Sequence, residues 1–240
     1  MPTMKRKYLK SLLIVIVLVL IISVLNMKVT TRQGVNYQVR EIKLPLYLKI
    51  MDFVDRDCNY RNIVRNILGD TKYENEKTVR IFNWITANVR KNPEELPIID
   101  DHPLNILIRG YGVQDQFEDI FTILCTYADM EAFFKVFKNN SGENYNISFV
   151  KINGRWCPLS AFGGAYAIKG RAIASVDDIL SDKKLLAPFL SNLPKFETDS
   201  FLKEIKSMDY TVRSVRTKGQ SPIGRMLFRI RSILNRNSLA

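Results

Sequence analysis

The most prominent pattern along the chain is an apolar run near its N-terminus. Residues 12–25 are Leu, Ile and Val with Ser23 as the one polar member. With its flanks, at residues 8–27, the run approaches the ~20 residues that a helix needs to cross a bilayer. Basic residues are denser before the run than after it. The sequence therefore predicts a single-pass membrane protein whose N-terminus is cytoplasmic and whose bulk is extracytoplasmic. A cleaved signal peptide is the alternative, but no small-x-small site follows the run.

Helical spacing appears after a polar stretch at 30–40 that predicts a stalk. Residues 42–54 and 59–68 predict two short helices, the second ended by a glycine. Residues 74–89 predict a longer helix, with acidic residues at its start and basic residues at its end, as the helix dipole favours. Residues 92–105 contain three prolines and predict a loop.

The clearest helical pattern lies near the middle of the chain. Apolar side chains over 117–124 recur at helical spacing and predict a buried face on a helix at 116–128. Asp115 and Glu118 have the spacing of a capping box, which predicts that the helix starts there. The start of such a helix offers unpaired backbone N–H groups and the positive end of the helix dipole.

The pattern then changes from helical to extended. Residues 131–137, 145–152 and 155–162 predict strands, and Asn153-Gly154 predicts a tight hairpin turn. Ser175 predicts the cap of a short helix. Helices followed by a small antiparallel sheet indicate an α+β fold.

Residues 221–236 predict a basic amphipathic helix. Its apolar side chains fall on one stripe, while Arg225, Arg229 and Arg236 fall largely opposite. This form suits an anionic membrane surface, and an ordinary helix packed on the domain is the open alternative.

These patterns divide the chain into four parts. They are a basic end with the membrane anchor at 1–32, a stalk with leading helices at 33–73, a central domain at 74–200 and a basic tail at 201–240.

The net charge of +12 is concentrated at the two ends. Residues 1–32 carry six basic side chains and residues 211–240 carry seven, both without an acid, so residues 33–210 have a net charge of −1. A nucleic-acid-binding domain usually carries its basic charge on the folded body. We therefore expect contact with a membrane and no binding of nucleic acid.

The three cysteines and the single histidine suggest no metal site and no cofactor. Cys58, Cys125 and Cys157 lack metal-ligand spacing and are too few for a disulfide framework. Cys125 is predicted to lie in the core, and a bridge between Cys58 and Cys157 stays open. His102 lies in a loop-like context.

Three segments together resemble the bacterial transglutaminase-like domain over about residues 74–180. They are the predicted helix at 74–89, the helix start Gly110-Tyr111-Gly112-Val113-Gln114-Asp115-Gln116, and the hairpin Gly154-Arg155-Trp156. The resemblance implies a papain-like fold with helices packed on a small antiparallel sheet. It also implies a Cys at the helix start, a His opening the next strand and an Asp after the hairpin, which act as nucleophile, proton carrier and orienting group.

At the matching positions this chain has different residues. The Cys position falls on Gln114 and the Asp position on Ser160; the His position falls on Tyr145, with Asn144 and Asn146 as alternatives. Gln is not a nucleophile, Ser cannot stabilise an imidazolium by charge, and Tyr, with a pKa of about 10, is a poor base at neutral pH. No catalytic residue is therefore expected at these positions.

The resemblance implies a groove that binds a chain-like ligand without reacting with it. Its candidate residues are Tyr111, Gln114, Asp115, Trp84 and Trp156; core packing is the alternative reading, and for Trp156 it is the favoured one. The predicted function is a catalytically inactive, membrane-anchored binding or scaffolding module at the cell envelope, for peptide, protein or polysaccharide-linked ligands. The alternative is a cysteine-dependent amide hydrolase or acyltransferase with relocated catalytic groups, in which Cys157 would be the nucleophile.

Overall fold

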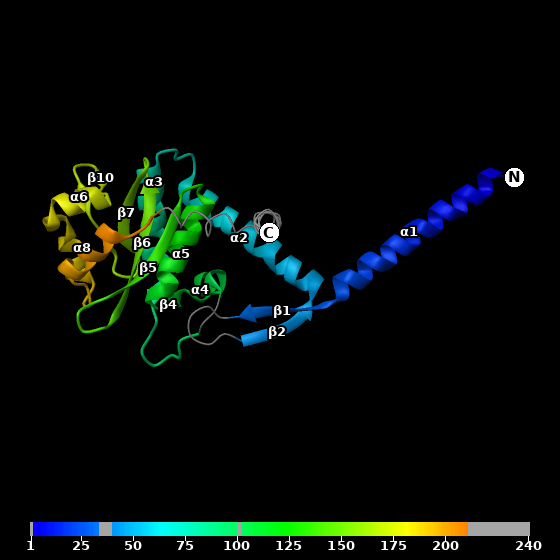
Figure 1. Ribbon diagram of the computed structural model, residues 1–240, viewed down its shortest axis with the longest axis horizontal. Helices are drawn as coiled ribbons and strands as arrows, with labels where there is room; N and C mark the ends of the chain where they lie inside the picture. Colours follow the sequence, from blue (N-terminus) through cyan, green and yellow to red (C-terminus); the bar gives the residue numbers. More distant parts are fainter. Residues whose placement is uncertain (1, 34–39, 100–101, 211–240) are drawn as a thin grey trace, which may run out of the picture.

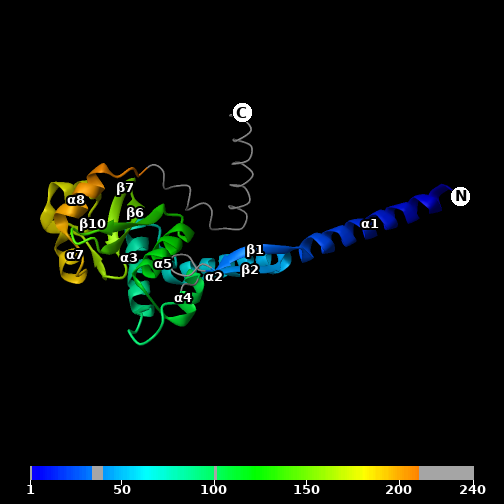
Figure 2. The ribbon, with the colours of Figure 1, turned by 60° about the horizontal axis from the view of Figure 1, so that its bottom comes forward.

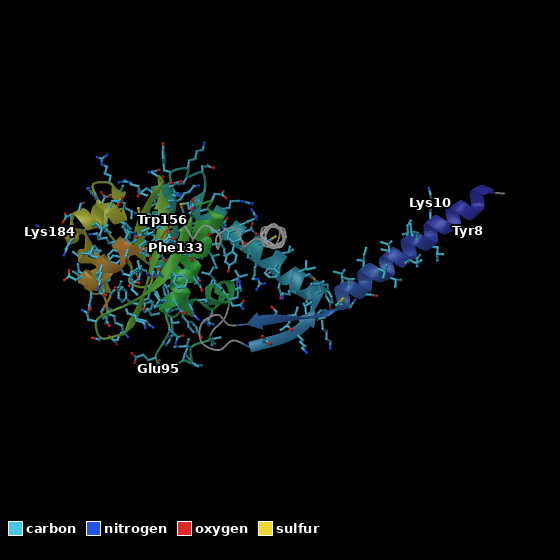
Figure 3. All side chains as sticks on the ribbon, viewed as in Figure 1. Tyr8, Lys10, Glu95, Phe133, Trp156 and Lys184 are labelled. Atoms are coloured by element: carbon cyan, nitrogen blue, oxygen red, sulfur yellow. The ribbon has the colours of Figure 1, made fainter. Side chains whose placement is uncertain are left out.

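The computed structural model describes residues 2–33, 40–99 and 102–210, without the side chains of residues 2–7, 9, 32, 33 and 40. Figure 1 shows a body of helices and strands from which the helix α1 (Pro2–Asn26) projects. Tyr8 and Lys10 lie toward the far end of that helix (Figure 3). The predicted amphipathic helix at 221–236 lies outside the described residues.

The predicted apolar run forms most of α1. The apolar side chains of residues 12–22 and 24 are 46–63% exposed, so they point outward all around the helix. Across the part of the chain that the structure describes, no helix has both the length and the apolar content that crossing a membrane requires.

The segment that joins α1 to the body differs from the sequence prediction. The predicted stalk is a hairpin in which β1 (Lys28–Gln33) pairs antiparallel with β2 (Arg40–Pro45). The two predicted short helices are one helix, α2 (Leu46–Leu68). Residues 55–58 contain no Gly or Pro to break it, and side chains bridge this part of the helix, as when Arg61 Nε donates to Asp57 Oδ2 at 2.9 Å.

The body has three layers, which confirms the predicted α+β fold. The middle layer is an antiparallel sheet in the order β5 (Ala132–Lys138), β6 (Asn144–Ile152), β7 (Arg155–Ser160), β8 (Ala165–Tyr166). One face packs on α2, α3 (Glu74–Asn88) and α5 (Gln114–Tyr127). The other face packs on α6 (Val176–Ser181), the 3-10 turn η1 (Lys183–Leu186), α7 (Ala187–Asn192) and α8 (Thr198–Ser207). Figure 2 shows α7 and α8 on one side of the sheet and α3 and α5 on the other.

Short elements complete the body. The loop predicted at 92–105 ends early, because Pro103 begins α4 (Pro103–Arg109). β3 (Arg90–Lys91) pairs in parallel with β4 (Tyr111–Gly112), which leads directly into α5. β9 (Ile168–Lys169) pairs with β10 (Ala172–Ile173).

The hairpin between β6 and β7 forms as predicted. Asn153 and Gly154 have φ values of 49° and 80°, the positive values that a type I′ turn requires. The turn fixes the register in which Ser148 lies opposite Leu159. This register brings the N-terminal half of β6 beside the last residue of β7.

The alternation of β6 assigns its side chains to the two layers. Tyr145, Ile147 and Phe149 belong to the core beneath the C-terminal helices, whereas Val150 and Ile152 belong to the core around α5. Successive side chains of a strand point to opposite faces. Asn146 and Ser148 therefore face α5.

α8 extends across residue 200 and belongs to the body. Phe201, Leu202 and Ile205 are spaced along one helix face and are buried beneath the sheet. The residues just after position 200 are therefore part of the packed core.

Candidate functional site

The start of α5 is built by a side chain that the sequence analysis did not assign to it. The helix begins at Gln114, and Gln116 Oε1 accepts a hydrogen bond from Val113 N at 3.1 Å. The predicted capping box of Asp115 and Glu118 is therefore wrong. Asp115 accepts from Gln116 N at 3.0 Å, and Glu118 has a different environment.

Gln116 also ties the preceding loop to the helix. Its Nε2 donates to Ile99 O at 2.8 Å, and a Cβ placed on Gly112 would lie 2.9 Å from its Oε1. Glycine at 112 thus permits the close approach that the capping glutamine needs. These contacts fix the first turn of α5, at which Gln114 lies.

Glu118 lies one turn after Gln114 and is fully buried. Its Oε2 accepts from Ser148 Oγ at 2.5 Å, and its Oε1 accepts from Ser160 Oγ at 3.1 Å and from Phe162 N at 3.2 Å. One carboxyl group therefore joins α5 to β6, to the end of β7 and to the turn that follows β7.

The burial of Glu118 changes its acidity. Removal from water raises the pKa of its carboxyl to about 7, against the opposing effect of the hydrogen bond from Ser148 and the other donors. Near neutral pH this carboxyl is consequently divided between its protonated and ionised forms.

Asn146 lies at the same end of this arrangement as Gln114. α5 and β6 run in the same direction, because the chain reverses into β5 and again into β6. Glu118 and Ser148 are in contact. Gln114 precedes Glu118 by about 6 Å along the helix, and Asn146 precedes Ser148 by about 7 Å along the strand, so the two residues lie at a similar level. Asn146 is 8% exposed, and its Oδ1 has no hydrogen-bond partner within the described residues.

Tyr145 does not lie at this site, which corrects the sequence prediction. It stacks on Phe137 at 5.6 Å between ring centroids and meets Phe196 edge-on, on the opposite face of β6. A shift of one residue reverses the face of a strand, so Asn146, one of the two alternatives, is on the face toward α5. Asn144, at the edge of the strand, is exposed.

Ser160 is the last residue of β7 and lies beside α5. Its Oγ donates to Glu118 and accepts from Gly163 N at 3.1 Å. The structure thus gathers a set of side chains along the first two turns of α5, which we call the α5 polar cluster: Gln114, Glu118, Asn146, Ser148 and Ser160.

The groove candidates fall into two groups. Tyr111 and Asp115 lie next to the start of α5, and the guanidinium of Arg109 stacks on the Tyr111 ring at 5.0 Å. Trp84 packs partly buried on α3 against the core around α5. Trp156 lies on the other face of the sheet, next to Phe133 (Figure 3), with its ring centroid 5.1 Å away. Core packing, the reading favoured for Trp156, agrees with this contact.

The cysteines and the histidine lie apart from one another. Cys58 is exposed on α2 and Cys157 is buried on β7, and both are free. Burial raises the pKa of the Cys157 thiol to about 12, and this thiol donates weakly to backbone carbonyls. His102 Nδ1 lies 3.3 Å from Tyr60 Oη at the start of α4. Cys125 is buried in the core, as predicted.

Two other features of the surface are separate from the cluster. An open pocket of about 570 Å³ lies between α2 and α3, lined by Asp70, Thr71, Lys72, Tyr73, Glu76 and Arg80. The pocket lies at the N-terminal end of α3, away from the start of α5. At this end of α3, Glu74 accepts a hydrogen bond from Asn153 N in the β6–β7 turn. Within the described ranges, no three His, Cys, Asp or Glu side chains are arranged to hold a metal ion.

No family model and no curated protein matches this sequence. Among solved structures, a candidate cysteine protease from Cytophaga hutchinsonii is similar, at 16% identity and a TM-score of 0.39 over 46% of this chain and 42% of that one. A candidate protease from Parabacteroides distasonis is similar at 11% identity and a TM-score of 0.38 over 55% and 36%. A structure named as a TGase is similar at 10% identity and a TM-score of 0.39 over 59% and 46%. The matched region is less than half the length of each of these structures.

Proposed function

We propose that this chain is a membrane-attached binding module of transglutaminase-like arrangement, whose ligand site is the exposed end of the α5 polar cluster. The observation that carries the proposal is the set of side chains at the start of α5. The resemblance places Gln114 and Ser160 at the Cys and Asp positions, and Asn146 is one of the alternatives to Tyr145 at the His position. Together these side chains do not provide the nucleophile, the proton carrier and the orienting charge that the reaction needs.

Asn146 supports a role in binding. Its Oδ1 is a buried acceptor without a partner within the described residues, and such atoms cost free energy until a donor reaches them. Because this oxygen is buried, binding requires the Asn146 side chain to turn toward the ligand. Gln114, partly exposed on the neighbouring turn, can both donate and accept. A peptide or a polysaccharide-linked peptide at the cell envelope carries the N–H and O–H donors that this end of the cluster lacks.

The membrane attachment rests on α1. Its apolar side chains are exposed all around the helix, a surface that water does not favour. The denser basic residues before the run support a cytoplasmic N-terminus with the body on the other side. In this arrangement the α5 polar cluster faces the extracytoplasmic space.

The cysteine-dependent enzyme is supported less well. Cys157 is buried, its thiol has a raised pKa, and the thiolate is the reactive form. His102 is engaged with Tyr60 on a different part of the body. No observation favours this alternative over the binding module.

A binding measurement tests the proposal. Soluble peptidoglycan fragments that carry their stem peptides are titrated into the detergent-solubilised chain by calorimetry, with a peptide-free polysaccharide as a second arm. We expect the peptide-bearing fragments to bind. Asn146→Ala should lower their affinity about tenfold, because it removes one buried hydrogen bond. Asn144→Ala, on the exposed edge of the same strand, is the matched control and should leave the affinity unchanged.

Two results would contradict the proposal. Equal affinities of the wild type and Asn146→Ala would remove Asn146 from the binding site. Hydrolysis or crosslinking of the fragments that is abolished by Cys157→Ala would establish the enzyme in place of the binding module.

A further inference from the structure

α2 is divided into two halves with different surroundings. In its second half Tyr60, Val64 and Leu68 are buried in the core of the body. In its first half Tyr47, Leu48, Ile50, Met51 and Val54 are 38–62% exposed, the largest value belonging to Met51. The second half holds the domain together, while the first half presents apolar side chains outward.

Four of these exposed side chains form a continuous stripe, and Leu48 lies about 60° beyond Met51, outside it. At about 100° per residue, Tyr47, Met51, Val54 and Cys58 fall within one narrow sector of the helix and Ile50 at its edge. Lys49 points to the opposite side, where its Nζ donates to Thr30 O at 2.9 Å and holds the β1–β2 hairpin against the helix. The hairpin therefore covers the face of α2 that is opposite the stripe. We call Tyr47, Ile50, Met51 and Val54 the α2 stripe.

The start of α2 is fixed to the end of α1. Leu46 N donates to Met27 O at 2.9 Å, so the first residue of α2 lies at the level where α1 ends. Figure 1 shows α1 and α2 leaving this junction in different directions, with the hairpin beside them. Wherever α1 leaves a membrane, the first turns of α2 are at the surface of that membrane.

We propose that the α2 stripe lies in the interfacial layer of the bilayer that holds α1, so that α2 orients the body against the membrane. This inference rests on the membrane attachment proposed above. A helix that binds this way has an apolar face without acids and an aromatic residue near the headgroups. Tyr47 supplies the aromatic residue. At about 100° per residue, Asp57 falls about 20° beyond Ile50 and Asp55 about 40° beyond Met51, so acids border the stripe on both sides without falling within it. Asp57 is bonded to Arg61 and Tyr127 on the side of the body.

Site-directed fluorescence in nanodiscs tests the proposal on the full chain. In a Cys58→Ser background, single cysteines replace Met51, Asp52 or Leu18 and carry a small fluorophore; Cys125 and Cys157 are buried and should stay unlabelled. Lipids with a nitroxide below the headgroup are the quencher for the probes at 51 and 52, and lipids with a nitroxide near the end of the acyl chain are the quencher for the probe at 18, which lies at the middle of the proposed span. We expect the probe at 51 to be quenched roughly twofold more than the probe at 52, because an interfacial helix buries its apolar face about 5–10 Å deep.

The probe at 18 separates the two proposals. Quenching at 18 and equal, weak quenching at 51 and 52 would overturn the interfacial placement of α2 while leaving the anchor in place. Absence of quenching at 18 would show that α1 is not in the lipid, and the membrane attachment itself would fail. Strong quenching at 51 that is matched at 52 would also contradict the stripe, because it would put the whole helix in the lipid.

Discussion

Glu118→Ala is expected to lower the free energy of unfolding by about 3–5 kcal/mol. The substitution removes the one acceptor shared by Ser148 Oγ, Ser160 Oγ and Phe162 N, all of which are held against a carboxyl group with no exposed surface. A buried donor left without an acceptor costs about 1–3 kcal/mol, and the cavity adds to this cost. Urea unfolding followed by tryptophan fluorescence at pH 6 measures the change.

Glu118→Gln is the matched control for this prediction. The amide keeps the shape of the carboxyl, so its oxygen accepts from Ser160 and Phe162 and its nitrogen donates to Ser148. We expect this variant to remain within about 1–2 kcal/mol of the wild type. An alanine variant as stable as the glutamine variant would show that Glu118 does not hold α5 to β6 and β7.

The second large effect is a loss of stability as the pH rises from about 4.5 to about 7. In the unfolded chain the Glu118 carboxyl has a pKa of 4.5 and loses its proton first, whereas burial holds its pKa at about 7 in the folded chain. The folded form thus binds the extra proton throughout this interval. The expected loss is about 3 kcal/mol, after which this contribution stays constant at higher pH.

Denaturation curves between pH 4.5 and pH 8 measure this dependence, with Glu118→Gln as the reference. The difference between the wild type and this variant removes the contributions of other groups. Asp178, whose pKa is lowered chiefly by the hydrogen bond from Lys169, acts at pH values below this interval. Parallel pH profiles for the two proteins would mean that the Glu118 carboxyl reaches water in the folded state.

The sequence predicted the sheet better than it predicted the segment before the body. Period-two alternation and the Asn153-Gly154 turn are local signals, and they located β6, β7 and the hairpin between them. The β1–β2 hairpin depends on contacts with α2, among them the bond from Lys49 to Thr30, and polar composition alone suggested a stalk. Tertiary contact decided the structure of this segment.

The candidate site was predicted in part. Gln114 begins α5 and Ser160 contacts the same helix through Glu118, whereas Tyr145 faces the opposite core and its neighbour Asn146 faces α5. Counting residues back from the hairpin cannot show which of two neighbouring strand residues faces α5. The structure shows it, because alternate residues of β6 are buried in two different cores.

Glu118 and Ser148 were not recognised as partners. The Asp115–Glu118 spacing of a capping box gave Glu118 a local role that Gln116 performs. One signal was available: Glu118 is three residues before Phe121 and seven before Cys125, so it shares their buried helix face. A carboxyl on such a face needs buried donors, and the polar residues of the next strands could have supplied them.

The most direct test of the account is the acidity of a cysteine placed at position 114. In a Cys58→Ser background, the rate of alkylation of Gln114→Cys is measured against pH, alone and with Asn146→His, Asn144→His or Tyr145→His. The start of α5 should lower the thiol pKa below its usual ~8.5, and a histidine at 146 should lower it by about one further unit or more through an imidazolium beside the thiolate. Histidine at 144 or 145 should leave it unchanged. An equal shift from the histidine at 145, or no shift from the one at 146, would contradict the claim that Gln114 and Asn146 face each other at one site.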